Sequence, residues 1–149
     1  MSIRLWLAAA LVLALAPGGA GASHLKEQPR KHRVVYHLSD APVEQAKFVL
    51  TNIHNNIVGA GGREHVEAIE LVVHGPALRN FVTATMDRDV KRMLESLQAD
   101  GVVLGACGNT MKSFSLTLEQ LPAGTRRLPQ GGVVRIMELV EQGYVYIRP

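Results

Sequence analysis

The only cysteine of the chain, Cys107, ends a short apolar run and is followed by Gly108, Asn109 and Thr110. Residues 102–106 have the length and β-branched content of a buried parallel strand, so the thiol is expected at the carboxyl edge of a sheet. Gly108 permits a tight turn, and Asn109 or Thr110 can cap a following helix. The N–H groups of such a helix end favour the thiolate, the reactive form of cysteine, by about 1 kcal/mol.

Two interpretations of Cys107 stay open from its position alone. The first is a reactive thiol that is accessible and has a lowered pKa. The second is a packing role, because free cysteine is among the most buried residue types. A single cysteine cannot form an internal disulfide, so the fold must rest on its hydrophobic core. In an oxidising compartment a lone thiol is open to over-oxidation, which favours either deep burial or a use.

The first 22 residues have the pattern of a secretory signal peptide. Arg4 supplies a positive charge, residues 5–16 (LWLAAALVLALA) form an apolar core, and Ala20 and Ala22 give an A-x-A cleavage signal. We therefore expect residues 1–22 to be removed on export to the periplasm; the alternative is an uncleaved N-terminal anchor. No later stretch is long and apolar enough to span a bilayer, so the cleaved protein is expected to have no membrane segment.

Composition places the remaining 127 residues in the class of single globular domains. A chain of this length can bury roughly two thirds of its unfolded surface in one core. The net charge of the full chain is +3, of which Arg4 contributes one. That small excess, without a patch of basic and aromatic residues, argues against nucleic acid as a partner. Residues 23–32 (SHLKEQPRKH) are polar and are expected to form a flexible lead-in to a domain that spans residues 33–149.

Strand-like and helix-like patterns alternate through this domain. Alternation of this kind predicts a parallel sheet with helices on both faces. Asp40 and Asp87 are expected to cap the first two helices. The expected strands cover residues 33–38, 66–74, 102–106, 125–128 and 144–147. The first helix is expected to bury Val43, Ala46, Val49, Leu50, Ile53 and Ile57, and the last helix Val133, Ile136, Met137 and Val140.

Ligands of parallel α/β folds bind at the carboxyl ends of the strands. In this chain those ends bring together His37, His74 and Cys107, provided that the three strands are neighbours. One hypothesis is that His37 or His74 serves as the proton partner or charge stabiliser of the thiol. The alternative is that each histidine caps its strand and faces water. Two histidines and a cysteine can also bind zinc or copper, but the chain has no CxxC, HxxxH or HxH spacing, so no metal site is expected.

The chain resembles the DsrE/DsrF-like family over about residues 33–149. The resemblance rests on the strand that ends in residues 107–111 (CGNTM), on the turn at His74 and Gly75, and on the tail of residues 132–149, which ends in GYVYIRP. It implies a three-layer α/β/α fold of Rossmann-like topology, with a mostly parallel sheet of about five strands, commonly assembled as trimers or hexamers. It also implies that Cys107 can take up sulfane sulfur as a persulfide and pass it on.

Cys107 is the principal site residue that the resemblance carries over, with Asn109, Thr110 and His74 as further candidates. The characterised sulfur-relay members are cytoplasmic, whereas this chain has an export signal, and no second cysteine is present to relay the sulfur. The leading hypothesis is therefore a periplasmic sulfur carrier, without cofactor or metal, whose donor and acceptor are other molecules. The alternatives are a module that binds a small ligand or a soft metal at the same rim, and an oligomeric interaction protein with an inert Cys107.

Overall fold

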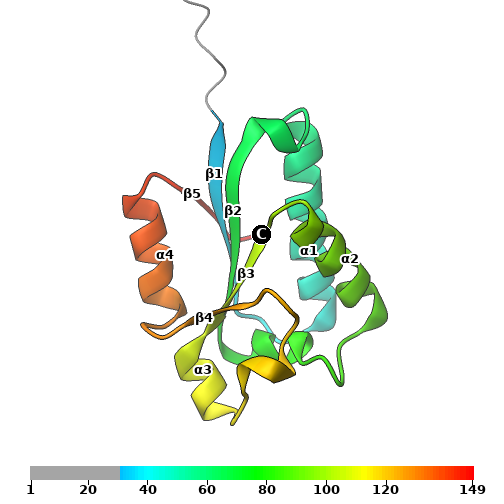
Figure 1. The fold of residues 1–149 in the computed structure, drawn as a ribbon, viewed down its shortest axis with the longest axis vertical. Helices are drawn as coiled ribbons and strands as arrows, with labels where there is room; N and C mark the ends of the chain where they lie inside the picture. Colours follow the sequence, from blue (N-terminus) through cyan, green and yellow to red (C-terminus); the bar gives the residue numbers. More distant parts are fainter. Residues whose placement is uncertain (1–30) are drawn as a thin grey trace, which may run out of the picture.

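The computed structural model describes residues 31–149, so the expected signal peptide and most of the lead-in lie outside the described range. A five-stranded sheet in the order β4-β3-β2-β1-β5 forms its centre (Figure 1), and all four neighbouring pairs are parallel. The expectation of a parallel sheet of about five strands is confirmed. The strands are β1 (His32–Leu38), β2 (Val66–Val73), β3 (Val103–Cys107), β4 (Arg126–Leu128) and β5 (Val145–Ile147).

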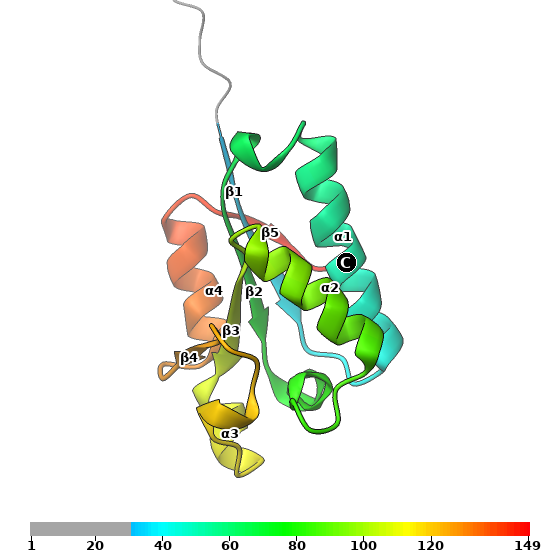
Figure 2. The ribbon, with the colours of Figure 1, turned by 45° about the vertical axis from the view of Figure 1, so that its right-hand side comes forward.

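Helices lie on both faces of the sheet, as Figures 1 and 2 show. One face carries α1 (Val43–Gly59) and α2 (Arg88–Ala99), and the other carries α4 (Gly132–Glu141). The short helix α3 (Gly108–Ser113) follows β3 without an intervening loop. None of the helices within residues 31–149 combines the length and the apolarity needed to cross a membrane. The described part of the chain also contains the 3-10 helices η1 (Arg63–His65), η2 (Gly75–Phe81) and η3 (Leu118–Gln120).

The larger core lies between the sheet and the layer of α1 and α2. The predicted cap of α2 is confirmed, because the Asp87 carboxylate accepts hydrogen bonds from the N–H groups of Asp89 and Val90. The predicted cap of α1 is wrong: Asp40 lies two residues before the N-cap Pro42, and α1 has no side-chain cap. The predicted stripe of α1 is confirmed in all but Val43, which is only partly buried; the fully buried members are Ala46, Val49, Leu50, Ile53 and Ile57.

The opposite face of the sheet, which we call the α4 face, holds a smaller core and the groups of chemical interest. Leu139 of α4 packs there against Val35, Val72 and Leu128. Because side chains alternate along a strand and neighbouring parallel strands share their alternation, the residues two positions further along also face α4. This places His37, two residues after Val35, His74, two residues after Val72, and Cys107, the register partner of Leu128, on one face.

Helix α4 does not bury the face that the sequence predicts. Val133, Met137 and Val140 are 59%, 57% and 46% exposed, and Ile136 is only partly buried. The helix is turned so that Gly132, Arg135 and Leu139 face the sheet instead. The physical reason is a buried carboxylate, that of Glu70 on β2, which requires the guanidinium of Arg135 as its partner.

Candidate functional site

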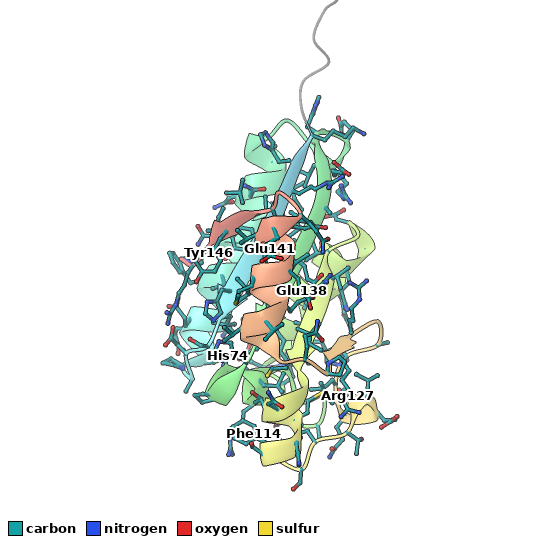
Figure 3. All side chains as sticks on the ribbon, turned by 90° about the vertical axis from the view of Figure 1, so that its left-hand side faces the viewer. His74, Phe114, Arg127, Glu138, Glu141 and Tyr146 are labelled. Carbon is teal, nitrogen blue, oxygen red and sulfur yellow. The ribbon has the colours of Figure 1, made fainter. Side chains whose placement is uncertain are left out.

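Cys107 ends β3 on the α4 face of the sheet. Its register partner on β4 is Leu128, and α4 begins at Gly132, so the start of this helix lies close to the end of β3. Figure 3 views this side and shows His74 beside the N-terminal end of α4, with Tyr146 further along, on β5. β3, β2 and β1 lie side by side in the sheet. The strand ends at Cys107, His74 and His37 are therefore neighbours, which is the condition that the sequence prediction set.

The sulfur of Cys107 lies among hydrogen-bond donors from two helices. The hydroxyl of Thr110 and the backbone N–H groups of Asn109, Thr110 and Gly132 lie near it and act to lower the pKa of the thiol. The Thr110 oxygen also accepts the N–H of Gly75 at 2.9 Å, which leaves the hydroxyl proton free to point at the sulfur. Burial acts to raise the pKa of the thiol, but these donors together outweigh it, and the pKa is lower than that of an ordinary cysteine.

Two glycines allow the helix ends to come this close. A Cβ on Gly108 would lie 2.8 Å from the carbonyl oxygen of Leu128, a backbone atom that cannot give way. A Cβ on Gly132 would lie 3.2 Å from Cβ of His74 and 3.3 Å from Cγ1 of Val72. The absence of a side chain at both positions therefore lets α3 and α4 meet the end of β3.

The structure changes the expected roles of the residues after Cys107. The expectation that Asn109 or Thr110 caps the helix is wrong, because the N-cap of α3 is Cys107 itself and both residues lie in the first turn. From that turn their N–H groups act to lower the pKa of the thiol. Cys107 is only 6% exposed, which is less than the interpretation of an accessible thiol implies.

The two histidines of the rim pair with each other. Nε2 of His37 lies 2.6 Å from Nε2 of His74, and Nδ1 of His37 lies 2.7 Å from the hydroxyl of Tyr146. Burial, followed by the charges of His74 and Arg148, lowers the pKa of His37 to about 4. Burial and Arg148 also lower the pKa of His74. Both imidazoles are therefore neutral near pH 7, and one N–H is shared between them.

Neither histidine hydrogen-bonds the thiol within the part of the chain that the structure describes. His74 borders the site through packing, since it lies beside Gly132, whose N–H helps to lower the pKa of the thiol. The arrangement of possible metal ligands does not favour a metal centre. Among residues 31–149, no three His, Cys, Asp or Glu side chains lie close enough together to hold an ion.

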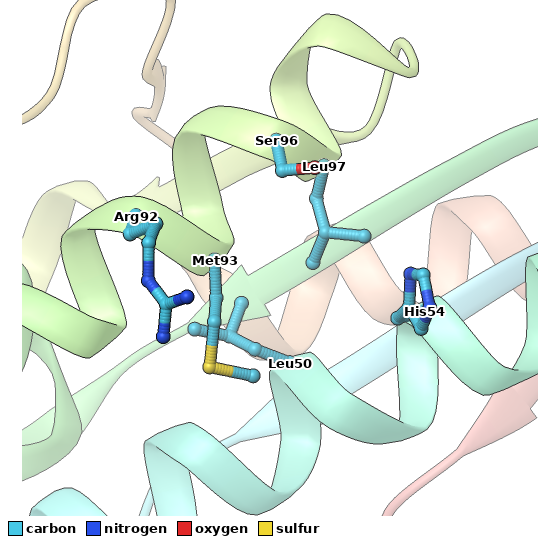
Figure 4. A pocket seen from close by; sticks show the side chains of 6 residues that line it. All are labelled: Leu50, His54, Arg92, Met93, Ser96 and Leu97. Atoms are coloured by element: carbon cyan, nitrogen blue, oxygen red, sulfur yellow. The ribbon is translucent and has the colours of Figure 1, made fainter.

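A pocket of about 230 Å³ lies away from the thiol, between α1 and α2 on the other side of the sheet (Figure 4). It is lined by apolar and polar side chains from the two helices, and Cys107 is not among them. The chemistry of the thiol site is therefore separate from this hollow. The lining residues are Leu50, His54, Arg92, Met93, Ser96 and Leu97.

Sequence reasoning missed four residues of the α4 face: Gly132, Tyr146, Glu70 and Arg135. Glu70 carried a usable signal, because it is the charged residue inside the otherwise apolar run of residues 68–73. A charge within a strand buried on both faces requires a partner. Gly132 and Tyr146 carried no such signal, since their roles depend on which strands become neighbours.

Comparison with known proteins agrees with this architecture. A model of the DsrE/DsrF-like family matches residues 36–149. A protein of unknown function from Methanobacterium thermoautotrophicum, MTH1491, has a similar structure: TM-score 0.68 and 23% identity, over 80% of this chain and 100% of that one. The ychN protein from E. coli gives a TM-score of 0.61 and 14% identity, over 79% and 99%. Both likenesses concern the fold. No curated protein matches the chain. The match to the family model runs from Tyr36, within β1, to Pro149, and the chain belongs to the DsrE/DsrF-like family.

Proposed function

We propose that this protein is a periplasmic sulfur carrier that takes up sulfane sulfur on Cys107 as a persulfide and passes it to a partner. Membership of the DsrE/DsrF-like family supports a sulfur-relay-type role in general. The observation that supports the specific proposal is the set of donors around the sulfur, from Thr110, Asn109 and Gly132. Such donors stabilise a negative charge on the sulfur more than they stabilise a neutral thiol.

The uptake step is a nucleophilic displacement. The Cys107 thiolate attacks the outer sulfur of a sulfane donor, a new S–S bond forms, and the bond between that sulfur and the rest of the donor breaks. The leaving group departs with the electron pair, and the product is a Cys107 persulfide anion. No outside oxidant is required, because the oxidation state of the transferred sulfur comes from the donor.

The release step reverses the roles of the groups. An acceptor thiolate attacks the outer sulfur, and Cys107 leaves as a thiolate. A lowered pKa assists this step, since a thiol of lower pKa is the better leaving group. The chain contains one cysteine, so the acceptor is a second molecule, either a protein thiol or a small thiol.

We also propose that the protein is a homo-oligomer, a trimer or a hexamer. The support is the outward face of α4, which we call the α4 stripe: Val133, Val134, Met137 and Val140, each between 44% and 59% exposed. These positions share one side of the helix, and clusters of exposed apolar side chains mark interaction surfaces. The stripe lies opposite the residues that anchor α4 to the sheet, so a second copy can cover it without disturbing the site.

Binding of a small ligand or a soft metal at the same rim is the second candidate function. The observation in its favour is the pair of neutral imidazoles of His37 and His74, whose Nε2 atoms lie 2.6 Å apart. A metal there would need ligands beyond these two. Metal analysis of the purified protein separates this candidate from the first, since a sulfur carrier of the proposed kind holds no stoichiometric metal.

Cyanolysis of the sulfur-loaded protein tests the carrier function. Protein incubated with polysulfide and desalted is expected to release about one equivalent of thiocyanate on reaction with cyanide, because cyanide removes sulfane sulfur from a persulfide. Cys107→Ser is the matched control and is expected to release none. An equal yield from both proteins would place the labile sulfur elsewhere and contradict the proposal.

A further inference from the structure

Glu70, in the middle of β2, is the one buried charged side chain within residues 31–149; it is 3% exposed. The guanidinium of Arg135 binds it at two points: Nε donates to Oε1 at 2.9 Å, and Nη2 donates to Oε2 at 2.8 Å. Arg126 on β4 adds one longer bond to Oε2, at 3.3 Å. The hydrogen bond to Glu70 is the main cause that raises the pKa of Arg135 above its ordinary value. A two-point contact of this kind fixes orientation as well as distance.

Arg135 belongs to the first turn of α4. Its backbone N–H donates to the carbonyl of Gly131 at 3.1 Å, and its Nη1 donates to Glu138 at 3.3 Å. The carboxylate of Glu138 also accepts the side-chain amide of Gln130 at 2.9 Å. The side chain that binds Glu70 is therefore built into the same turn that presents the N–H of Gly132 to Cys107.

Other anchors of α4 lie further from the site. Leu139 is the fully buried apolar side chain of this helix, and it is seven residues from Gly132, about 10 Å along the axis. Ile136 is only partly buried, and Gly132 has no side chain to hold it. The Glu70–Arg135 contact is consequently the strong attachment nearest to the donor that reaches the thiol.

We propose that the buried Glu70–Arg135 ion pair holds the first turn of α4 over Cys107 and thereby sets the reactivity of its sulfur. Glu70 and Arg135 are then positioning residues for sulfur uptake, and this role rests on the proposed function. The reason is distance: a hydrogen bond to sulfur or oxygen weakens steeply once donor and acceptor separate beyond the normal range. Loosening the turn removes the Gly132 N–H from the thiolate while Thr110 and Asn109 stay in place.

A direct charge effect of Glu70 would act in the opposite direction. Glu70 is the register partner of Val103, four residues before Cys107, which corresponds to about 13 Å along the strand. Removing a negative charge at that distance slightly favours the thiolate and lowers the pKa of Cys107. Loss of the Gly132 donor raises that pKa. The sign of the change therefore identifies the mechanism.

The test measures the pKa of Cys107 from the pH dependence of alkylation by iodoacetamide, in the full mature chain. Glu70→Gln keeps the shape of the side chain and removes its charge; it is expected to raise the pKa of Cys107 by about 0.5 to 1 unit. The rate of alkylation below the midpoint then falls about 3- to 10-fold. The matched control is Glu67→Gln on the same strand, whose partner Arg33 is exposed; it is expected to leave the profile unchanged. An unchanged or lowered pKa in folded Glu70→Gln would overturn the proposal.

Arg135→Lys keeps the test decisive if Glu70→Gln fails to fold. Lysine supplies the charge that buried Glu70 needs, but it cannot make the two-point contact of arginine. It is expected to raise the pKa of Cys107 with little loss of circular dichroism, and a wild-type profile in this variant would overturn the proposal. Failure of the carrier function itself is distinguishable: wild-type protein would then show an ordinary cysteine pKa, or no sulfur uptake, whatever residue 70 is.

Discussion

The backbone N–H of Gly132 is among the groups near the sulfur of Cys107 that lower the pKa of the thiol, although the two residues are 25 positions apart and lie on different elements. This contact joins the start of α4 to the end of β3. It adds a donor from a ten-residue helix to those that the local turn of α3 supplies. The positive end of the α4 dipole thus lies at the thiol, where it favours the thiolate.

Gly132→Ala is expected to weaken this contact. The new Cβ would lie 3.2 Å from Cβ of His74 and 3.3 Å from Cγ1 of Val72, which is tight enough to push the helix end and these side chains apart. We expect a loss of about 1–3 kcal/mol in the free energy of unfolding and a raised pKa of Cys107. Urea unfolding and thiol alkylation against pH measure the two effects. The control Gly59→Ala meets nothing within 4 Å and is expected to cause neither; a tolerated Gly132→Ala with an unchanged pKa would refute the role of the contact.

Thr110→Val tests the hydroxyl that links Gly75 to the thiol. The variant keeps the side-chain shape but removes the acceptor of the Gly75 N–H and a donor to Cys107. We expect a cost of about 1–3 kcal/mol in stability and a higher pKa of Cys107, read from the ultraviolet absorbance of the thiolate. Thr110→Ser restores both hydrogen bonds and is expected to return the pKa to the wild-type value. Equal pKa values in the valine and serine variants would show that the hydroxyl is irrelevant.

Stability is expected to fall in mild acid because of the pair of His37 and His74. The pKa of His37 is about 4 in the fold, against about 6.5 in the unfolded chain. Between these pH values the unfolded chain binds more protons than the folded chain. The contribution of the neutral pair to the free energy of unfolding is therefore complete above about pH 6.5 and is lost as the pH falls toward about 4. Urea midpoints at several pH values measure the slope.

His37→Gln is the variant for this comparison, and His54→Gln, at an exposed histidine of α1, is its control. The first is expected to flatten the loss of stability between about pH 6.5 and 4, while the second keeps the wild-type slope. An equal slope in all three proteins would assign the acid sensitivity to other groups.

Assembly is expected to depend on the α4 stripe. Met137→Glu places a charge in its centre and should shift the protein from an oligomer to a monomer, as light scattering reports. The matched control is Val58→Glu on α1, where an equally exposed apolar residue lies outside the stripe. A wild-type protein that is already monomeric at micromolar concentration, or an oligomer that survives Met137→Glu, would contradict the proposed assembly surface.

Sequence patterns predicted the elements whose packing is local. The spacing of residues 46–57 specified the buried face of α1, and Asp87 specified the start of α2, because both depend on neighbours within one or two turns. The run before Cys107 predicted β3 to within one residue. These features follow from periodicity and capping alone.

Features that depend on distant partners could not be predicted in this way. The apolar pattern of α4 indicated Val133, Met137 and Val140 as its core face, whereas the charge of Glu70 on another element turns Arg135 inward. The N–H of Gly132 at the thiol and the contact of His37 with His74 arise from the order of the strands. Amphipathicity indicates which side of a helix is apolar, but not whether the sheet or another protein covers that side.

The most direct test of the carrier function is the intact mass of native protein after incubation with polysulfide. We expect one adduct of about 32 Da, a single sulfur atom, which dithiothreitol reverses and which Cys107→Ser abolishes without changing the circular dichroism. A small donor is used because Cys107 is buried, with 6% of its surface exposed. An unmodified native protein, whose thiol reacts only after unfolding, would show that Cys107 is a core residue and would contradict the account.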